Sequence, residues 1–215
     1  MLRIDPTEWP RATTYQLYRR MGAPHLGITA DVDVTALLEA ARRDGTSLFA
    51  AVMHRLTGAA NAVPQLRQRI RIEGEDEYVV QHDRVDPAFT VPVEGGLFNF
   101  ASVPFAADLE AFASAVAQAS AAQRHNLELQ PFEDLRDDVF YMSCLPWMHF
   151  TSMTHPVHTD WPDSVPRIAW GRFTKVDGRT TMPVNIQVHH ALVDGSHLGA
   201  FFGALDDGDY PSNSG

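Results

Sequence analysis

Residues 184–202 read VNIQVHHALVDGSHLGAFF and decide how the C-terminal part of this chain folds. The alternating apolar residues at the start predict a β-strand, and the apolar run at the end predicts a helix beginning near Gly195. Because side chains alternate along a strand, we expect His190 to continue the apolar row begun by Val184, and His189 to join the polar row. The stretch therefore places an imidazole between a strand end and a helix N-terminus, where functional groups are common.

An imidazole in that position has several interpretations. A histidine shielded from water has a lowered pKa, stays neutral at pH 7, and then has the free nitrogen that a general base needs. Position alone favours a packed structural role for His190, however, and Asp194 alone also fits an N-cap of the following helix. His197, in the first turn of that helix, is interpreted as packed or solvated. The residues by themselves leave these alternatives open.

The composition bounds the class of protein. Its 215 residues, 45% hydrophobic and 20% charged, are typical of a globular fold. We predict one domain over residues 1–205 and a flexible tail over 206–215. The formal net charge of −10 argues against a nucleic-acid partner, because phosphate backbones are bound through lysine and arginine patches. The only cysteine is Cys144, and no apolar run approaches the about 20 residues of a membrane span. We therefore expect a cytoplasmic protein without a membrane partner.

Apolar patterns elsewhere predict a mixed order of helices and strands. Helices are expected over residues 33–45, 47–62 and 108–123. Strands are expected on both sides of turns at residues 73–76, 94–96 and 177–178, with another short strand over 139–144. This order predicts an α/β fold of the α+β type, a two-layer sandwich of packed helices on a mixed, mostly antiparallel sheet.

The motif H-H-x-x-x-D-G at residues 189–195 resembles the signature of coenzyme-A-dependent acyltransferases. That signature occurs in chloramphenicol acetyltransferases, dihydrolipoamide acyltransferase cores and peptide-synthetase condensation domains. Condensation domains are much longer, and the dihydrolipoamide enzymes usually carry additional upstream modules. Further stretches resemble type A chloramphenicol acetyltransferases in the same order and at similar spacing: Trp9-x-Arg11 with Tyr15 to Arg19, Val85 to Val91, Ser143 to Trp147, and Pro183 to Gly195. The chain is similar to that family over nearly its whole length.

The resemblance implies an enzyme that transfers an acetyl group from acetyl-CoA, a co-substrate rather than a resident cofactor, to a hydroxyl of chloramphenicol or a similar small molecule. It implies a ternary complex in which His190 is the general base and Ser143 donates to the tetrahedral oxyanion. It also implies that Asp194 and Arg19 form an ion pair that holds the loop presenting His190. A homotrimer with active sites at subunit interfaces is implied as well. Without the resemblance, Ser143 reads as a backbone-bonded serine and Arg19 as a solvated charge.

The resemblance also implies residues for coenzyme A. Trp147 matches a residue that lines the coenzyme channel, and Arg172 with Phe173 replaces a basic-aromatic pair near the coenzyme. The residues alone also fit core packing for Trp147 and an exposed hairpin position for Arg172. Ser47 stands near the place of an expected coenzyme-contacting lysine.

The acceptor side departs from the family pattern. His25 and Leu26 replace part of an aromatic-rich stretch that lines the acceptor pocket. Ala169 replaces a threonine that helps to hold a water, and Ser196 replaces a bulky aromatic residue. A different acyl donor or acceptor in a biosynthetic pathway, and a non-catalytic protein that sequesters a ligand, therefore stay open beside acetylation of chloramphenicol and antibiotic resistance.

Residues 149–160 contain His149, His155, His158 and Asp160, which together suggest a metal cluster. Their spacing fits no standard zinc site, and prolines interrupt the segment. We therefore expect loop histidines that are solvated or line a pocket, and no metal.

Overall fold

The computed structural model describes residues 1–128 and 136–205, so the tail expected over 206–215 lies outside the described residues. The helices are α1 (Ala12–Arg19), α2 (Thr35–Arg43), α3 (Leu48–Ala62), α4 (Leu109–Gln123) and α5 (Gly195–Gly203), with short 3-10 turns at Pro64–Arg67 and Glu94–Gly96. The strands are β1 (Leu2–Ile4), β2 (His25–Asp33), β3 (Gln68–Glu73), β4 (Asp76–Gln81), β5 (Asp86–Pro92), β6 (Phe98–Ser102), β7 (Val139–Leu145), β8 (Arg167–Gly171), β9 (Thr174–Val176) and β10 (Arg179–His189).

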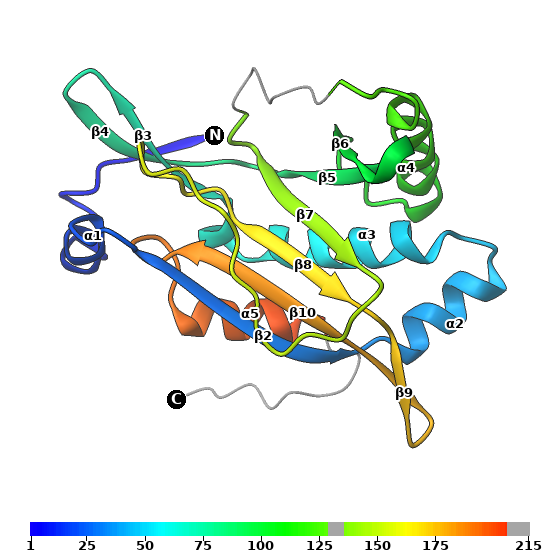
Figure 1. Cartoon of the computed structure of the whole chain (residues 1–215). Coiled ribbons are helices and arrows are strands. Elements are labelled where there is room, and N and C mark those ends of the chain that lie inside the picture. The colour runs from blue at the N-terminus through cyan, green and yellow to red at the C-terminus, as the bar shows by residue number, and fades with distance from the viewer. Residues whose placement is uncertain (129–135, 206–215) are drawn as a thin grey trace.

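A seven-stranded sheet in the order β2-β10-β8-β7-β5-β6 forms the main layer, with β9 paired to β10. The β7 strand is parallel to β5 and β8, and the other pairs in this sheet are antiparallel. A separate three-stranded sheet has the order β1-β4-β3. Helices α3 and α5 lie along one face of the main sheet (Figure 1). The predicted mixed, mostly antiparallel sheet with packed helices is confirmed.

Local sequence signals explain where several elements begin and end. Ser47 caps α3 by accepting from the Ala50 N–H, and Asp108 caps α4 by accepting from the Ala111 N–H. Gly45, with φ of 69°, follows α2 and adopts the left-handed conformation that suits a helix end. The predicted hairpin around residues 73–76 is present as the β3–β4 pair.

The centre of the fold is β10, which is buried on both faces from Met182 to His189. Its even-numbered residues pack in the main hydrophobic core, as the alternation predicted. Its polar row is also covered, since Asn185 is 1% exposed and Gln187 6% exposed. The strand ends at His189, so the expectation that His190 continues the apolar row as a strand residue is wrong: His190 lies in the turn that follows.

No helix within the described residues is both long enough and apolar enough to cross a membrane.

Candidate active site

The turn after β10 holds His190 in one orientation. Its peptide N–H donates to the Pro24 carbonyl oxygen at 2.7 Å, which ties the turn to the chain just before β2. Its ring nitrogen Nδ1 lies 3.0 Å from the Val193 carbonyl oxygen. A carbonyl oxygen only accepts hydrogen bonds, so Nδ1 carries the proton in this contact. In the neutral ring, Nε2 is then the nitrogen with the free lone pair.

Tyr18 of α1 packs flat against the His190 ring. The two ring centroids are 3.9 Å apart and the rings are inclined by only 16°. The stack restricts rotation of the imidazole, while the Val193 carbonyl fixes its tautomer. The sequence analysis placed Tyr18 inside the N-terminal motif but gave it no role. Its position next to Arg19 in that motif was the signal that could have marked it as a site residue.

The predicted ion pair between Asp194 and Arg19 is wrong. Arg11 binds both carboxylate oxygens of Asp194, through a contact from Nη1 to Oδ2 and a 2.9 Å hydrogen bond from Nη2 to Oδ1. These hydrogen bonds hold the pKa of the Asp194 carboxyl below its ordinary value. Arg19 instead binds Glu77 of β4, with Nε to Oε1 at 3.0 Å and Nη2 to Oε2 at 2.6 Å.

The geometry of α1 explains the exchange of partners. Arg11 immediately precedes the helix and Arg19 is its last residue, so eight residues separate the two arginines by about 12 Å along the axis. The first end of α1 lies beside the loop after β10, and the second lies beside β4. Both arginines stand in the same sequence motif, and the motif does not tell which end faces Asp194.

Asp194 combines the two roles that the sequence offered as alternatives. It is the N-cap residue of α5 and also the partner of Arg11. His197, in the first turn of that helix, accepts the Asp194 peptide N–H at Nδ1 over 3.0 Å. The end of the loop at Asp194 is therefore held both by the ion pair with Arg11 and by the start of α5.

His189, rather than His190, is the deeply desolvated histidine. His189 is 2% exposed, whereas the side chain of His190 is 24% exposed. Burial lowers the pKa of His189 to about 3. Its Nδ1 accepts the Ala191 peptide N–H at 3.2 Å, which agrees with the expected hydrogen-bonding structural role. His190 is less covered than His189 because the strand ends one residue earlier.

Ser143 lies elsewhere on the sheet. It pairs with Ala169 of β8, which pairs in turn with Asn185 of β10, so these side chains form one row on one face. The last strand residue, His189, follows Asn185 by four residues, about 13 Å at the rise of a strand, and His190 lies in the turn beyond it. A cavity of about 500 Å³ opens beside Ser143, and His190 is not among the residues that line it. The structure does not bring Ser143 and His190 together within one chain.

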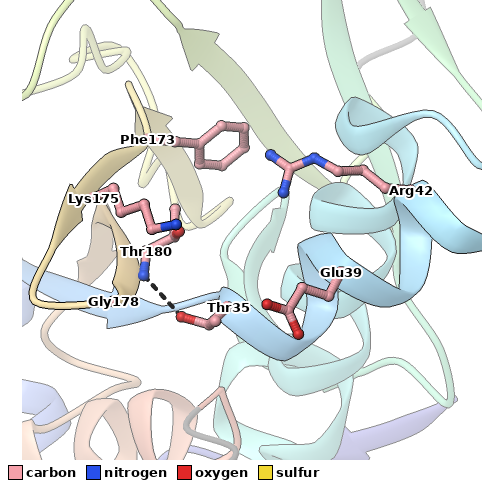
Figure 2. A pocket seen from close by; sticks show the side chains of 7 residues that line it. All are labelled: Thr35, Glu39, Arg42, Phe173, Lys175, Gly178 and Thr180. Carbon is pink, nitrogen blue, oxygen red and sulfur yellow. Dashed lines mark hydrogen bonds between the residues drawn. The ribbon is translucent and has the colours of Figure 1, made fainter.

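Phe173 lines a second cavity, of about 320 Å³, between α2 and the β9–β10 hairpin. Figure 2 shows Arg42 extending from α2 toward Phe173, while Lys175 extends into the cavity from β9. A hydrogen bond joins α2 to β10 at this cavity: the Thr180 N–H donates to the Thr35 hydroxyl oxygen at 2.8 Å (Figure 2). Phe173 is one of the residues predicted for coenzyme binding, which stays a prediction, and sequence reasoning did not single out Arg42 and Lys175 because they lie far apart in sequence on different elements.

The other residues predicted for coenzyme binding lie outside that cavity. Arg172 precedes Phe173 and is exposed, but it does not line the cavity. The Trp147 side chain is 72% exposed, so the alternative of core packing for this residue is wrong. Ser47 is occupied as the cap of α3.

The predicted acceptor residues are largely internal. The His25 Nε2 lies 3.0 Å from the Asp163 carbonyl oxygen, and its ring meets His189 edge to face with centroids 5.4 Å apart. Leu26 is half-buried against the core. Ala169 is fully buried, which leaves no accessible side-chain surface for the predicted contact with substrate.

The loop histidines have different hydrogen-bond and ring partners. The His149 Nε2 lies 2.9 Å from a carboxylate oxygen of Asp31. His155 and His158 both line the cavity beside Ser143, and His158 also stacks on Trp161 with ring centroids 3.9 Å apart.

The comparisons with known proteins agree with this architecture. The family model for chloramphenicol acetyltransferase matches residues 1–206. The chain is 28% identical over 204 residues to chloramphenicol acetyltransferase 2 of Escherichia coli, covering 94% of each. It is 31% identical over 196 residues to the chloramphenicol acetyltransferase of Streptomyces acrimycini, covering 90% of this chain and 87% of that protein. A solved chloramphenicol acetyltransferase structure matches with a TM-score of 0.83 at 24% identity, covering 96% of this chain and 99% of that chain. The chain therefore belongs to the chloramphenicol acetyltransferase family and is an acyltransferase.

Proposed function

We propose that this enzyme transfers the acetyl group of acetyl-CoA to a hydroxyl of a small molecule, with chloramphenicol as the first acceptor to test, and that His190 is the general base. The observation that carries the proposal is the 3.0 Å contact between the His190 Nδ1 and the Val193 carbonyl oxygen. Because that contact places the proton on Nδ1, it leaves Nε2 free to accept a proton. The flat stack on Tyr18 holds Nε2 in a constant direction.

The reaction follows from that geometry. Nε2 of His190 removes the proton of the acceptor hydroxyl while its oxygen attacks the thioester carbonyl carbon. The resulting tetrahedral oxyanion receives a hydrogen bond from the Ser143 hydroxyl. When the intermediate collapses, the carbon–sulfur bond breaks and the protonated His190 returns its proton to the coenzyme A sulfur. The products are the acetyl ester and free coenzyme A, and the enzyme returns to its starting state.

The proposal includes a homotrimer in which His190 of one protomer faces the Ser143 cavity of a neighbour. The separation between His190 and the Ser143 row within one chain supports this, since a base and an oxyanion donor must both lie within hydrogen-bond reach of one reacting centre. A cyclic assembly brings the two surfaces together once per interface.

Complementation between inactive variants tests this arrangement. Mixed oligomers of His190→Ala and Ser143→Ala subunits are expected to regain about a quarter of the sites, because random pairing at a cyclic interface unites one intact His190 with one intact Ser143 at that frequency. Native mass spectrometry verifies that the subunits have exchanged. Subunits that exchange without regaining thiol release would refute the shared site.

We propose the Phe173 cavity for the nucleotide end of acetyl-CoA. Arg42 and Lys175 supply two cationic groups for phosphate against one carboxylate, that of Glu39. Phe173 offers a ring face for a base. Trp147, exposed after β7, supplies an uncovered indole for the coenzyme arm. We place the reaction in the cytoplasm, where Cys144 is kept as a free thiol and acetyl-CoA is available.

A thiol-release assay with acetyl-CoA and a panel of alcohols that includes chloramphenicol tests the activity. The His190→Ala and His190→Gln variants are expected to lose at least about 10⁴-fold in kcat, while the free energy of unfolding and acetyl-CoA binding stay near those of the wild type. Retention of turnover by both variants would exclude His190 as the base. A host strain that survives chloramphenicol only with the intact gene would assign the role to antibiotic resistance rather than to biosynthesis.

A further inference from the structure

The cavity beside Ser143 combines an apolar lining with a few polar groups. It has a volume of about 500 Å³, within the range of small-molecule pockets. Its lining comes from β5, β6, β7, the first residue of β8 and the loop that joins β7 to β8: Ala88, Thr90, Phe98, Phe100, Tyr141, Met142, Ser143, His155, Pro156, Val157, His158 and Arg167. If the proposed function holds, this cavity receives the acceptor. Its polar groups then decide which acceptors bind.

His155 is attached to β10 by three hydrogen bonds. The Gln187 side chain accepts the His155 peptide N–H at 3.0 Å and donates to the His155 carbonyl oxygen at 3.3 Å. The His155 ring also bonds through Nε2 to Oδ1 of Asn185 at 2.8 Å. Asn185 and Gln187 are almost fully buried on the central strand. Both the backbone and the ring of this loop histidine are therefore held against the central strand.

The surroundings of Asn185 determine which nitrogen of His155 carries the proton. The Asn185 amide nitrogen lies 3.3 Å from the Ile28 carbonyl oxygen and 3.2 Å from the Met153 carbonyl oxygen, which only accept hydrogen bonds. The amide oxygen must therefore face His155, and it also only accepts. Nε2 of His155 is consequently the protonated nitrogen. Burial lowers the pKa of His155, so the ring is neutral at pH 7 and Nδ1 keeps its lone pair.

Nδ1 of His155 has no hydrogen-bond partner among residues 1–128 and 136–205. The residue lines the cavity, and it is held by Asn185, which lies in the same cross-strand row as Ser143. Two strand spacings, about 10 Å, separate the backbones of Ser143 and Asn185. An acceptor placed with its reacting hydroxyl at Ser143 thus reaches the His155 ring with a group several bonds away.

We infer that Nδ1 of His155 is a hydrogen-bond acceptor that selects acceptor molecules carrying a second donor group, a hydroxyl or an amide N–H, in addition to the hydroxyl that is acetylated. The inference rests on the proposed function for its catalytic readout. It assigns to His155 a contact with substrate that determines specificity. It leaves proton transfer to His190.

Single-donor analogues of one probe test this inference. The probe is chloramphenicol, which carries a secondary hydroxyl and an amide N–H besides its primary hydroxyl; one analogue has hydrogen in place of the secondary hydroxyl, and the other has a methylated amide. Each is measured for kcat/KM with the wild type and with His155→Leu. For at least one analogue, the wild type is expected to discriminate against loss of the donor by about tenfold or more, and His155→Leu to reduce that ratio to near one.

Two further variants separate this contact from a structural effect. His155→Gln keeps a donor toward Asn185 and an acceptor toward the cavity, so it is expected to restore part of the discrimination. His149→Leu is the matched control, because His149 is also a loop histidine whose Nε2 contacts a side-chain oxygen, but it does not line the cavity. His149→Leu is expected to retain the wild-type ratio.

The results that overturn the inference are specific. An unchanged ratio in His155→Leu for both analogues overturns it, and so does an equal fall in kcat for the probe and both analogues, which would make His155 structural or a base. If the wild type releases no thiol with any acceptor, the proposed function fails, and calorimetric binding of the same three compounds to wild type and His155→Leu still tests the contact. Equal affinity ratios in the two proteins would then overturn it.

Discussion

The ion pair of Arg11 with Asp194 is expected to support both stability and catalysis. The Arg11→Met substitution removes the charge and keeps most of the side-chain volume. The Arg11 side chain is 17% exposed and the Asp194 side chain 34% exposed, so the pair lies between an exposed pair, worth about 0–1 kcal/mol, and a buried pair, whose disruption costs about 3–5 kcal/mol. We therefore expect a loss of about 2 kcal/mol in the free energy of unfolding. For a chain of this size, that loss lowers Tm by about 4–8 °C.

The same substitution is expected to lower kcat by about 10–100-fold. Arg11 holds the loop whose Val193 carbonyl oxygen fixes the tautomer of His190, and displacement of a positioning group by about 1 Å costs up to about 10²-fold. The assay is thiol release under saturating acetyl-CoA, with the acceptor that gives the highest turnover in the panel. Calorimetric unfolding supplies the stability at the same protein concentration, because assembly makes Tm depend on concentration.

Arg19→Met is the matched control. Its ion pair with Glu77 has nearly the same exposure, 23% and 32%, so the loss of stability should be similar. This pair joins the far end of α1 to β4 and does not touch the loop of His190. We therefore expect Arg19→Met to keep kcat within about threefold of the wild type. The reasoning is refuted if Arg19→Met lowers kcat as much as Arg11→Met, or if Arg11→Met leaves kcat unchanged.

Three further predictions follow from the site. Ser143→Ala should lower kcat by about 10²–10³-fold with little change in the KM for acetyl-CoA, and Ser143→Thr should recover part of the rate. Tyr18→Phe should keep kcat within about threefold, whereas Tyr18→Ala should lower it by about tenfold because the His190 ring loses its stack. The pKa of His189 lies at about 3 in the folded state, far below its ordinary value of about 6.5. As pH falls below about 6.5, His189 is therefore protonated in the unfolded chain but stays neutral in the folded chain, which favours unfolding. Denaturant titrations should therefore show a loss of about 2 kcal/mol from this group between pH 7 and pH 5, and His189→Asn, which retains an acceptor for the Ala191 N–H, should show a smaller decrease.

The sequence predicted those parts of the fold that depend on local signals. Ser47 and Asp108 mark the starts of α3 and α4, and Gly45 marks the end of α2, because capping and positive φ are properties of single residues and their near neighbours. The strand β2 was not predicted, although Leu26 and Ile28 alternate in it. Its assignment comes from pairing along β10, a long-range property that no short window contains.

The candidate site also combines features that local sequence predicts with features that depend on long-range contacts. The motif around His190 predicts which residue is the base, but the tautomer of that residue depends on the Val193 carbonyl oxygen, whose direction is set by the turn. The choice between Arg11 and Arg19 depends on which end of α1 meets the loop, and both ends carry an arginine. The pair of Arg42 with Lys175 arises only when α2 and the β9–β10 hairpin come together around Phe173.

The adjacent histidines differ in environment because the strand ends between them, which gives His189 a structural role and leaves His190 as the proposed base. His189 is the last residue of β10 and is kept neutral inside the protein, where its Nδ1 accepts a peptide N–H. His190 is the first residue of the turn, and its Nδ1 lies 3.0 Å from the Val193 carbonyl oxygen and 3.4 Å from Oδ1 of Asp194, so the carbonyl oxygen is its nearer acceptor. Asp194 lies nearby, but Arg11 occupies both of its oxygens. The carboxylate therefore serves to hold the loop, and the backbone fixes the proton on the proposed base. Any substitution that frees Asp194 from Arg11 changes both tasks at once, which is why stability and kcat are expected to fall together in Arg11→Met and to separate in Arg19→Met.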